Sequence, residues 1–313
     1  MYVDHYGQTW YKGNLHTHTT RSDGSQSPEL IAARYRHAGY DFLSVTDHFN
    51  PNQSDTVSET VETPDFLLLA GTEYGTRFNS ERDGIQRGGV IHIIGTGFTE
   101  PPEYRAGFTS QDIVDAIRQK DGLAIIAHPH WSRNLPEDVL AASGYDGIEV
   151  FNSLCERHFM RMGYAEVMVD QLACLGFPIP VIAADDTHGH NGLRTEEFGG
   201  FIMVQAGGLS RDNIVRAIRE RRFFASQGPW VQAKIEGSHV YVECTPTVEV
   251  KVITNMLGAM GVGGQPMTGA RFDMSKPSWS PVEPMYYRVE VIDEHGKKAW
   301  THPVRVPAAE AKP

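Results

Sequence analysis

Short apolar runs alternate with amphipathic segments through the first 205 residues of this 313-residue chain. Each run is four to seven residues long, which suits a buried strand better than a helix. The runs lie at 13–16, 41–46, 66–72, 90–96, 123–127, 148–151 and 181–184. Strands that alternate with helices predict an α/β fold with a mostly parallel sheet. Seven strands in about 205 residues favour a closed or nearly closed seven-stranded (β/α) barrel.

Capping residues mark where the helices between these strands begin. Ser27 followed by Pro28 predicts the start of a helix that runs to about residue 37. The segments 110–120, 156–175 and 211–222 are amphipathic and predict further helices.

The pattern changes towards the carboxyl end of the chain. Residues 230–306 alternate apolar and polar side chains with a period of two, and Gly- and Pro-rich connections separate the runs. This pattern predicts a smaller antiparallel β module, most similar to a sandwich. We therefore expect a barrel over 1–229, a β-sandwich-like module over 230–306 and a flexible tail over 307–313.

The chain is acidic. It has 28 Lys+Arg and 39 Asp+Glu, for a net charge of −11, and residues 230–313 hold nine of each sign, so the excess lies in residues 1–229. Such a charge disfavours nucleic acid or an anionic membrane surface as the main partner. No apolar run reaches the length that spans a bilayer. Three cysteines without CxxC spacing, and an N-terminus without signal-peptide features, predict a cytoplasmic protein, and the oligomeric state stays open.

Histidine is the residue whose placement is most informative. Eleven of the 14 histidines lie in the first 190 residues, and several directly follow an apolar run. In barrels of this kind, functional groups gather at the carboxyl ends of the strands. Nine candidates fall at such ends or, for His92, within a strand: His16, His18, Asp23, His48, Glu73, His92, His128, Asp186 and His188.

These side chains suit metal ions. His16 and His18 stand two apart on an extended segment and point to the same side, although a lone His-x-His fits two surface histidines equally well. Six imidazoles and three carboxylates exceed what one tetrahedral zinc ion uses, so the set predicts two to three divalent ions. Nitrogen and oxygen ligands without thiolate favour zinc, manganese or iron. For single members, His92 above all, the alternative is a place behind the ligands or in the core.

Four other polar residues near these candidates have two interpretations each. His130 and His190 stand two residues past a proposed ligand, so each is either the general acid for the leaving group or an exposed histidine. Arg194 is either a clamp for a substrate phosphate or a solvated loop residue. Asp47 either orients a ligand imidazole or has a packing role.

Six short motifs follow one another along the first 190 residues: Gly13-Asn-Leu-His-Thr-His-Thr-Thr-Arg-Ser-Asp-Gly24, Val45-Thr-Asp-His48, Gly71-Thr-Glu73, His92-Ile-Ile-Gly95, Ala127-His-Pro129 and Asp185-Asp-Thr-His188. In this order they resemble the PHP (polymerase and histidinol phosphatase) superfamily of metal-dependent phosphoesterases, over about residues 10–225. The segments 221–229 and 299–303 resemble the branch named for carbaryl hydrolase, which adds a C-terminal β module.

The resemblance implies a distorted seven-stranded barrel that holds up to three metal ions. Its motif positions distribute the candidates over three ions: His16, His18 and Asp186 on one; Asp23, His48 and His188 on the second; and Glu73, as a bridge, with His92 and His128 on the third. Some relatives have a histidine where Asp23 stands, and the carboxylate favours an oxygen-preferring ion such as Mn²⁺ there.

These features together predict a hydrolase. Two cations that share a water lower its pKa towards ~7 and so provide a bridging hydroxide at neutral pH. The expected function is a phosphoesterase that acts on a small phosphorylated metabolite. The alternatives are a carbamate or carboxylic ester hydrolase and, in another class, a metal-containing binding or accessory module. The sequence has no GxGxxG, P-loop or GxSxG element to support a nucleotide-binding or serine-hydrolase interpretation.

Overall fold

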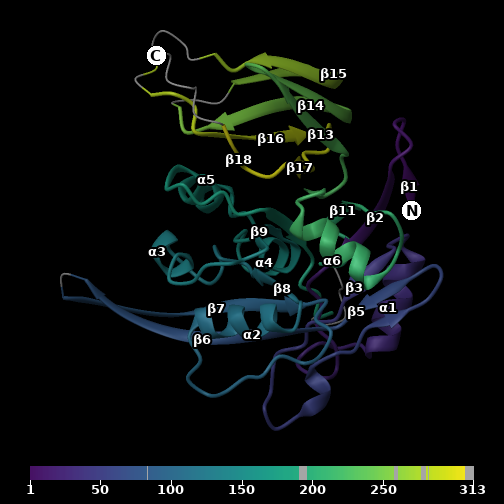
Figure 1. The fold of residues 1–313 in the computed structure, drawn as a ribbon, viewed down its shortest axis with the longest axis vertical. Helices are drawn as coiled ribbons and strands as arrows, with labels where there is room; N and C mark the ends of the chain where they lie inside the picture. Colours follow the sequence, from purple (N-terminus) through teal and green to yellow (C-terminus); the bar gives the residue numbers. More distant parts are fainter. Residues whose placement is uncertain (83, 190–195, 257–259, 276–279, 281, 307–313) are drawn as a thin grey trace. The chain divides into compact units, whose positions relative to one another are not determined.

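The computed structural model describes residues 1–82, 84–189, 196–256, 260–275, 280 and 282–306 (Figure 1). The chain forms two compact units. The first consists of Met1–Met168 and Ile182–Phe223, and the second of Val169–Val181 and the residues from Phe224 onward. The second unit thus takes in a segment from the middle of the chain. The expected tail, 307–313, lies outside the described residues.

The first sheet of the first unit contains six short strands: β1 (Tyr2–Val3), β2 (Thr9–Asn14), β3 (Phe42–Ser44), β4 (Val61–Glu62), β5 (Leu67–Leu69) and β11 (Phe201–Gln205). The strands β2, β3 and β5 run parallel. The outer strands are antiparallel to them, with β1 and β11 paired to β2 and β4 paired to β5.

The second sheet contains five strands: β6 (Gly71–Arg82), β7 (Ile85–Thr96), β8 (Leu123–Ile126), β9 (Gly147–Asn152) and β10 (Val181–Ala184). Their spatial order is β10-β9-β8-β7-β6. The pair β8–β9 is parallel, whereas β6–β7 and β7–β8 are antiparallel. The fold is therefore a mixed α/β fold, as expected.

Of the expected closed or nearly closed, mostly parallel barrel, closure and the parallel arrangement are wrong. Among the described strands, neither sheet closes on itself. Isolated bridges, Thr17–Thr187 and His48–Glu73, link residues near the strand ends of the two sheets. The parallel arrangement fails mainly because β6 and β7 form a long antiparallel hairpin. Residues 75–82 and 85–89 contain few apolar side chains and so resemble a loop in sequence, but their paired backbone amides and carbonyls make them strands.

Short helices connect the strands: α1 (Pro28–His37), α2 (Ser110–Gln119), α3 (Pro136–Val139), α4 (Ser153–His158), α5 (Glu166–Cys174) and α6 (Arg211–Arg219), with a 3₁₀ turn at Ser54–Thr56. The expected caps form, since the Ser27 hydroxyl accepts a hydrogen bond from the Leu30 amide. The segment 156–175, expected as one helix, is divided between α4 and α5. No helix in the described part of the chain has the length and apolar character needed to cross a bilayer.

A shared apolar core holds the two sheets of the first unit. Leu15, Phe42, Ile125 and Ile182 are fully buried in it. Gly13 is required where β2 passes β3, because a Cβ there would lie 2.0 Å from the Phe42 ring. This close packing fixes the positions of the strand ends, from which the candidate ligands project.

The second unit is an antiparallel β structure, with strands β12 (Phe223–Ser226), β13 (Val231–Glu236), β14 (His239–Thr254), β15 (Met260–Asp273), β16 (Tyr286–Ile292), β17 (Lys298–Trp300) and β18 (Val304–Arg305). An ion pair ties Val169–Val181 to this sheet. The buried Arg288 of β16 donates two hydrogen bonds to the Asp170 carboxylate, at 2.7 and 2.8 Å. This pair is one of the contacts that join residues 169–181 to the second unit.

Candidate metal centre

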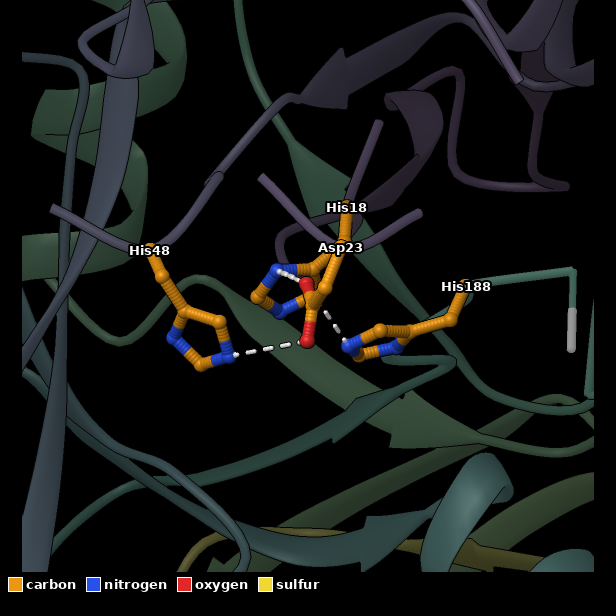
Figure 2. Close-up of side chains that lie close together, drawn as sticks. All are labelled: His18, Asp23, His48 and His188. Carbon is orange, nitrogen blue, oxygen red and sulfur yellow. Dashed lines mark ion pairs between the residues drawn. The ribbon is translucent and has the colours of Figure 1, made fainter. Parts of the chain in front are cut away.

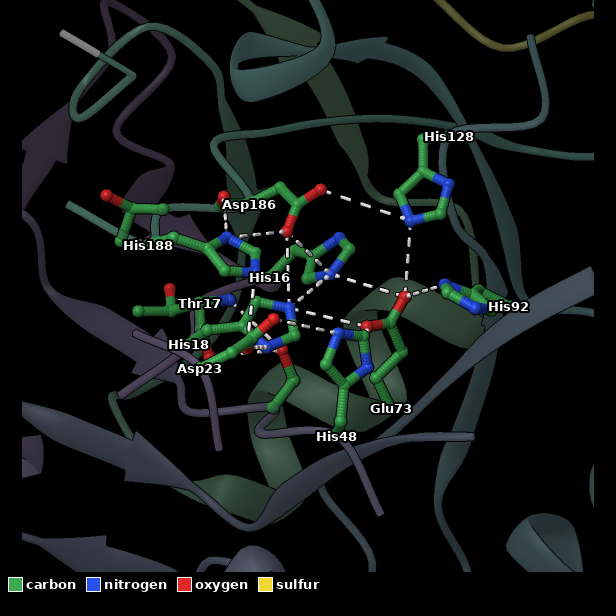
Figure 3. Close-up of polar contacts among 12 residues, drawn as sticks. His16, Thr17, His18, Asp23, His48, Glu73, His92, His128, Asp186 and His188 are labelled. Carbon is green, nitrogen blue, oxygen red and sulfur yellow. Dashed lines mark hydrogen bonds and ion pairs between the residues drawn. The ribbon is translucent and has the colours of Figure 1, made fainter. Parts of the chain in front are cut away.

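All nine candidate ligands come together in the first unit (Figure 3). Six of them follow the ends of strands β2, β3, β8 and β10: His16, His18, His48, His128, Asp186 and His188. Asp23 lies in the turn after His18. Glu73 and His92 lie within β6 and β7, and the strand expected to end at Glu73 is divided into β5 and the start of β6.

The nine residues form four overlapping groups whose possible ligand atoms lie within 4.8 Å of one another. These groups are His16, His128 and Asp186; His16, His18 and Glu73; His48, Glu73 and His92; and His18, Asp23, His48 and His188. We call the first the inner group, since all three members are buried, and the last the outer group.

Glu73 is the centre of the cluster. Its side chain is 1% exposed, and both of its oxygens face imidazoles. Oε1 lies 3.0 Å from His92 Nδ1 and 3.2 Å from His128 Nε2, while Oε2 lies 2.9 Å from His48 Nδ1 and 3.3 Å from His18 Nε2. A carboxylate so placed can serve two cations at once.

Asp186 is the second shared carboxylate. Its Oδ1 lies 3.2 Å from Nε2 of both His16 and His18, and the two Nε2 atoms are 3.1 Å apart. The backbone is strained at two of the candidate ligands: φ is 54° at Asp186 and 27° at His128. Non-glycine residues adopt such angles at a cost, and they cluster at functional sites.

The outer group is arranged around Asp23, whose carboxylate forms ion pairs with the other three members (Figure 2). Asp23 Oδ1 lies 3.3 Å from His188 Nε2 and 3.5 Å from His18 Nδ1, and its Oδ2 lies 3.6 Å from His48 Nε2. The side chains of Asp23 and His48 are 53% and 41% exposed.

The carboxylates of the cluster attract positive charge, either as protons on the imidazoles or as bound cations. Burial would lower the pKa of His16, but the neighbouring carboxylates raise it well above its usual value. Burial likewise opposes protonation of His188, yet its contact with Asp23 raises the pKa to about 9. Burial would raise the pKa values of Glu73 and Asp186, but the surrounding imidazoles lower both. Each carboxylate therefore stays ionised among groups that can accept either a proton or a metal ion.

Three buried atoms of the cluster, Glu73 Oε2, His92 Nδ1 and Asp186 Oδ1, lie 2.9–3.3 Å from neighbouring ligand atoms but form no well-aligned hydrogen bond. Buried polar atoms are nearly always hydrogen-bonded, so each such exception needs an explanation. A cation at the cluster would provide one, because all three atoms are of the kinds that ligate zinc, manganese or iron. The residues present therefore fit divalent metal ions.

Glu149 and Asn152 of β9 lie behind the cluster, and the sequence analysis did not identify them. Glu149 Oε1 lies 2.8 Å from His16 Nδ1, and Oε2 accepts a hydrogen bond from the His128 amide at 2.7 Å. Asn152 donates to Glu149 and to Asp186. The available signal was a charged residue inside the apolar run of a buried strand, which requires a partner.

Asp47 shapes the turn that carries Asp23, and orients no imidazole through the hydrogen bonds described for it. Its carboxylate accepts hydrogen bonds from the Thr19 amide, the Thr19 hydroxyl and the Ser22 hydroxyl, each at 2.7 Å. Of its two interpretations, the packing role is therefore the one that the geometry favours.

A pocket of about 150 Å³ opens onto the cluster. One side is formed by candidate ligands, and the other by Trp131, Leu154, Cys155 and Phe159. The Trp131 ring packs edge-on against His128, with ring centroids 4.9 Å apart. The pocket thus places an apolar wall beside the groups that would hold metal.

The structure does not bring His130 to this pocket. His130 is exposed, its Nδ1 donates to the Tyr164 carbonyl at 2.9 Å, and it is absent from the described pocket lining. The other two predicted catalytic residues, His190 and Arg194, lie outside the described residues.

No protein-family model and no curated protein matches this sequence. Among solved structures, a two-domain protein from Bacteroides vulgatus that contains a predicted PHP-like metal-dependent phosphoesterase is 16% identical, with a TM-score of 0.50 over 97% of this chain and 98% of its own. A candidate metal-dependent phosphoesterase from Bifidobacterium adolescentis is also 16% identical (TM-score 0.39; 66% and 94% covered). So is an amidohydrolase from Chromobacterium violaceum with bound sulfate and no metal (TM-score 0.40; 67% and 96% covered). The first likeness shows a shared two-unit α/β fold.

Proposed function

We propose that the protein is a metal-dependent hydrolase of ester bonds, and that its substrate is a small phosphorylated molecule. The observation that carries this proposal is the convergence of six imidazoles and three carboxylates around Glu73, with buried ligand atoms that form no well-aligned hydrogen bond. The motif order and the likeness of fold to a protein with a PHP-like domain support it.

The cluster would hold two to three zinc, manganese or iron ions. Asp186 with His16 and His18 would hold one, the side chains of Asp23, His48 and His188 a second, and Glu73 would join these to a third at His92 and His128. When bound, such ions supply Lewis acidity and make water nucleophilic at neutral pH.

The side chains of the site orient the candidate ligands and exclude bulk water from the pocket. Glu73 and Asp186 neutralise part of the positive charge and hold the imidazoles in place. Trp131 and Phe159 cover one side of the pocket and limit access of bulk water. Cys155 also lines the pocket, but burial raises the pKa of its thiol, so it does not provide a thiolate nucleophile.

One observation favours the second candidate, a carbamate or carboxylic ester hydrolase. The described residues that line the pocket include no lysine or arginine, whereas they do include the apolar wall of Trp131, Leu154 and Phe159. Phosphate sites commonly use such cations, and an uncharged ester does not need them. His190 for proton transfer and Arg194 for phosphate binding remain proposals, whereas the exposed His130 contacts the Tyr164 carbonyl and does not line the pocket.

A panel of chromogenic esters tests the proposal and separates the candidates. We expect protein loaded with Zn²⁺ or Mn²⁺ to hydrolyse an aryl phosphate or an aryl phosphodiester faster than an aryl acetate or a naphthyl carbamate. The reverse order would establish the second candidate. No turnover of any ester by protein with a full metal content would favour a binding or accessory module.

A further inference from the structure

Glu149 contacts two members of the inner group with its two oxygens. Its side chain is completely buried. Oε1 pairs with His16 Nδ1 at 2.8 Å, and Oε2 accepts the His128 amide at 2.7 Å. A carboxylate at Nδ1 keeps the proton on that nitrogen, so the lone pair of Nε2 faces the cluster.

Asn152 extends this support to the third member of the inner group. Its Nδ2 donates to Glu149 Oε2 at 2.8 Å and to Asp186 Oδ2 at 3.1 Å. Its Oδ1 accepts the amide of Cys155 at 2.9 Å, which caps α4 and fixes the Asn152 side chain. One hydrogen-bonded network therefore holds His16, His128 and Asp186 from behind.

Two members of the outer group, Asp23 and His48, are less buried than the inner group, whereas His18 and His188 are buried. Asp23 lies in a turn and its side chain is 53% exposed; the Ser22 hydroxyl lies 3.1 Å from it, but the one hydroxyl proton is shared with Asp47 at 2.7 Å. The His48 side chain is 41% exposed. These two side chains must lose rotamer freedom when an ion binds, and water can reach them.

We infer that Glu149 and Asn152 are positioning residues that pre-form the inner group, and that the ion held by two of its members, His16 and Asp186, is retained while an ion at the outer group exchanges. This inference rests on the proposed metal site. A side chain already held in its ligating geometry loses less freedom on binding, and buried ligands limit the entry of water and chelators. The difference between the two groups follows from the support behind the inner ligands.

Stepwise release of Zn²⁺ from the full-length wild-type protein tests the inference without any variant. The protein is loaded with Zn²⁺, and the ions released per chain are followed with a chromophoric chelator, with metal content checked by mass spectrometry. We expect two phases, an early release followed by at least one retained ion. Release of all ions in one phase would refute the inference alone, whereas a protein that binds no ions would also refute the proposed function.

Matched variants assign the two phases. We expect Asp23→Asn to abolish the early phase and to leave the retained ion unchanged. Glu149→Gln should weaken binding of the retained ion by about 10- to 100-fold, the usual effect of losing a partner behind a ligand, and should leave the early phase unchanged. Equal effects of Glu149→Gln on both phases, or loss of the retained ion in Asp23→Asn, would refute the inference. If Glu149→Gln fails to fold, Asn152→Ala keeps the Glu149 carboxylate and removes its hydrogen-bond donor. This variant is expected to show the same selective loss.

Discussion

The replacement Glu73→Gln perturbs the centre of the cluster while it keeps the shape of the side chain. Four imidazole nitrogens lie close to the Glu73 carboxylate: those of His18 at 3.3 Å, His48 at 2.9 Å, His92 at 3.0 Å and His128 at 3.2 Å. A glutamine offers one oxygen and an NH₂ group, which is a donor and cannot ligate a cation. The variant therefore loses one negative charge and the ability to serve two ions.

The expected loss follows from the position of Glu73 in two of the four ligand groups. We expect turnover to fall at least ~100-fold, the scale on which changes at metal sites act. That factor corresponds to about 2.7 kcal/mol in the activation barrier. Metal content should fall by about one ion per chain, and the ion assigned to His16, His18 and Asp186 should stay bound.

Steady-state hydrolysis of the best chromogenic ester and metal content by mass spectrometry measure these two effects. A matched control is Glu103→Gln, because that carboxylate is 78% exposed and belongs to none of the ligand groups. We expect the control to match the wild type in both measurements. Near-normal turnover of Glu73→Gln with a full metal content would refute the bridging role.

Three further predictions concern the metal, the second unit and the pocket wall. Removal of all ions with a chelator should abolish hydrolysis and lower the melting temperature, since an ion present at ~1,000 times its dissociation constant stabilises the fold by about 4 kcal/mol; an unchanged melting temperature would contradict this. Arg288→Ala should lower the free energy of unfolding by about 3 kcal/mol in urea titrations, because it leaves the Asp170 carboxylate without its bidentate partner, while metal content stays as in the wild type. Trp131→Ala should raise KM for aryl esters by roughly 10-fold and leave KM for the corresponding methyl esters unchanged, and equal effects on both would remove Trp131 from the substrate site.

Features that depend on near neighbours in the chain could be predicted from the sequence. Ser27 caps α1 as expected, because a cap requires only a side chain and an amide three residues away. The apolar runs at 123–127 and 181–184 coincide with β8 and β10 to within a residue. Residues that follow such runs meet at the strand ends, which is why the nine candidates could be chosen before their geometry was known. Their role as ligands stays a prediction.

The hairpin of β6 and β7 was predicted only in part. The run at 90–96 lies within β7, but residues 75–82 and 85–89 carry mostly polar and small side chains without a strand pattern. Their strand conformation depends on hydrogen bonds between two backbones, which carry no side-chain signal. Their antiparallel pairing makes this part of the sheet antiparallel, where a parallel arrangement is expected from the sequence.

The sequence by itself determined the starts of α1, α2 and α6, several apolar strands and the set of side chains whose chemistry suits metal, since each follows from residue type and short spacing. The tertiary structure alone decided how these parts meet. Glu149 contacts His16 across 133 residues of chain, and Arg288 contacts Asp170 across 118. A carboxylate in an apolar run indicates that a partner exists, but only the packing of distant strands selects which imidazole it holds. The support behind the inner group, and the exposure of Asp23 in the outer group, are for that reason properties of the fold.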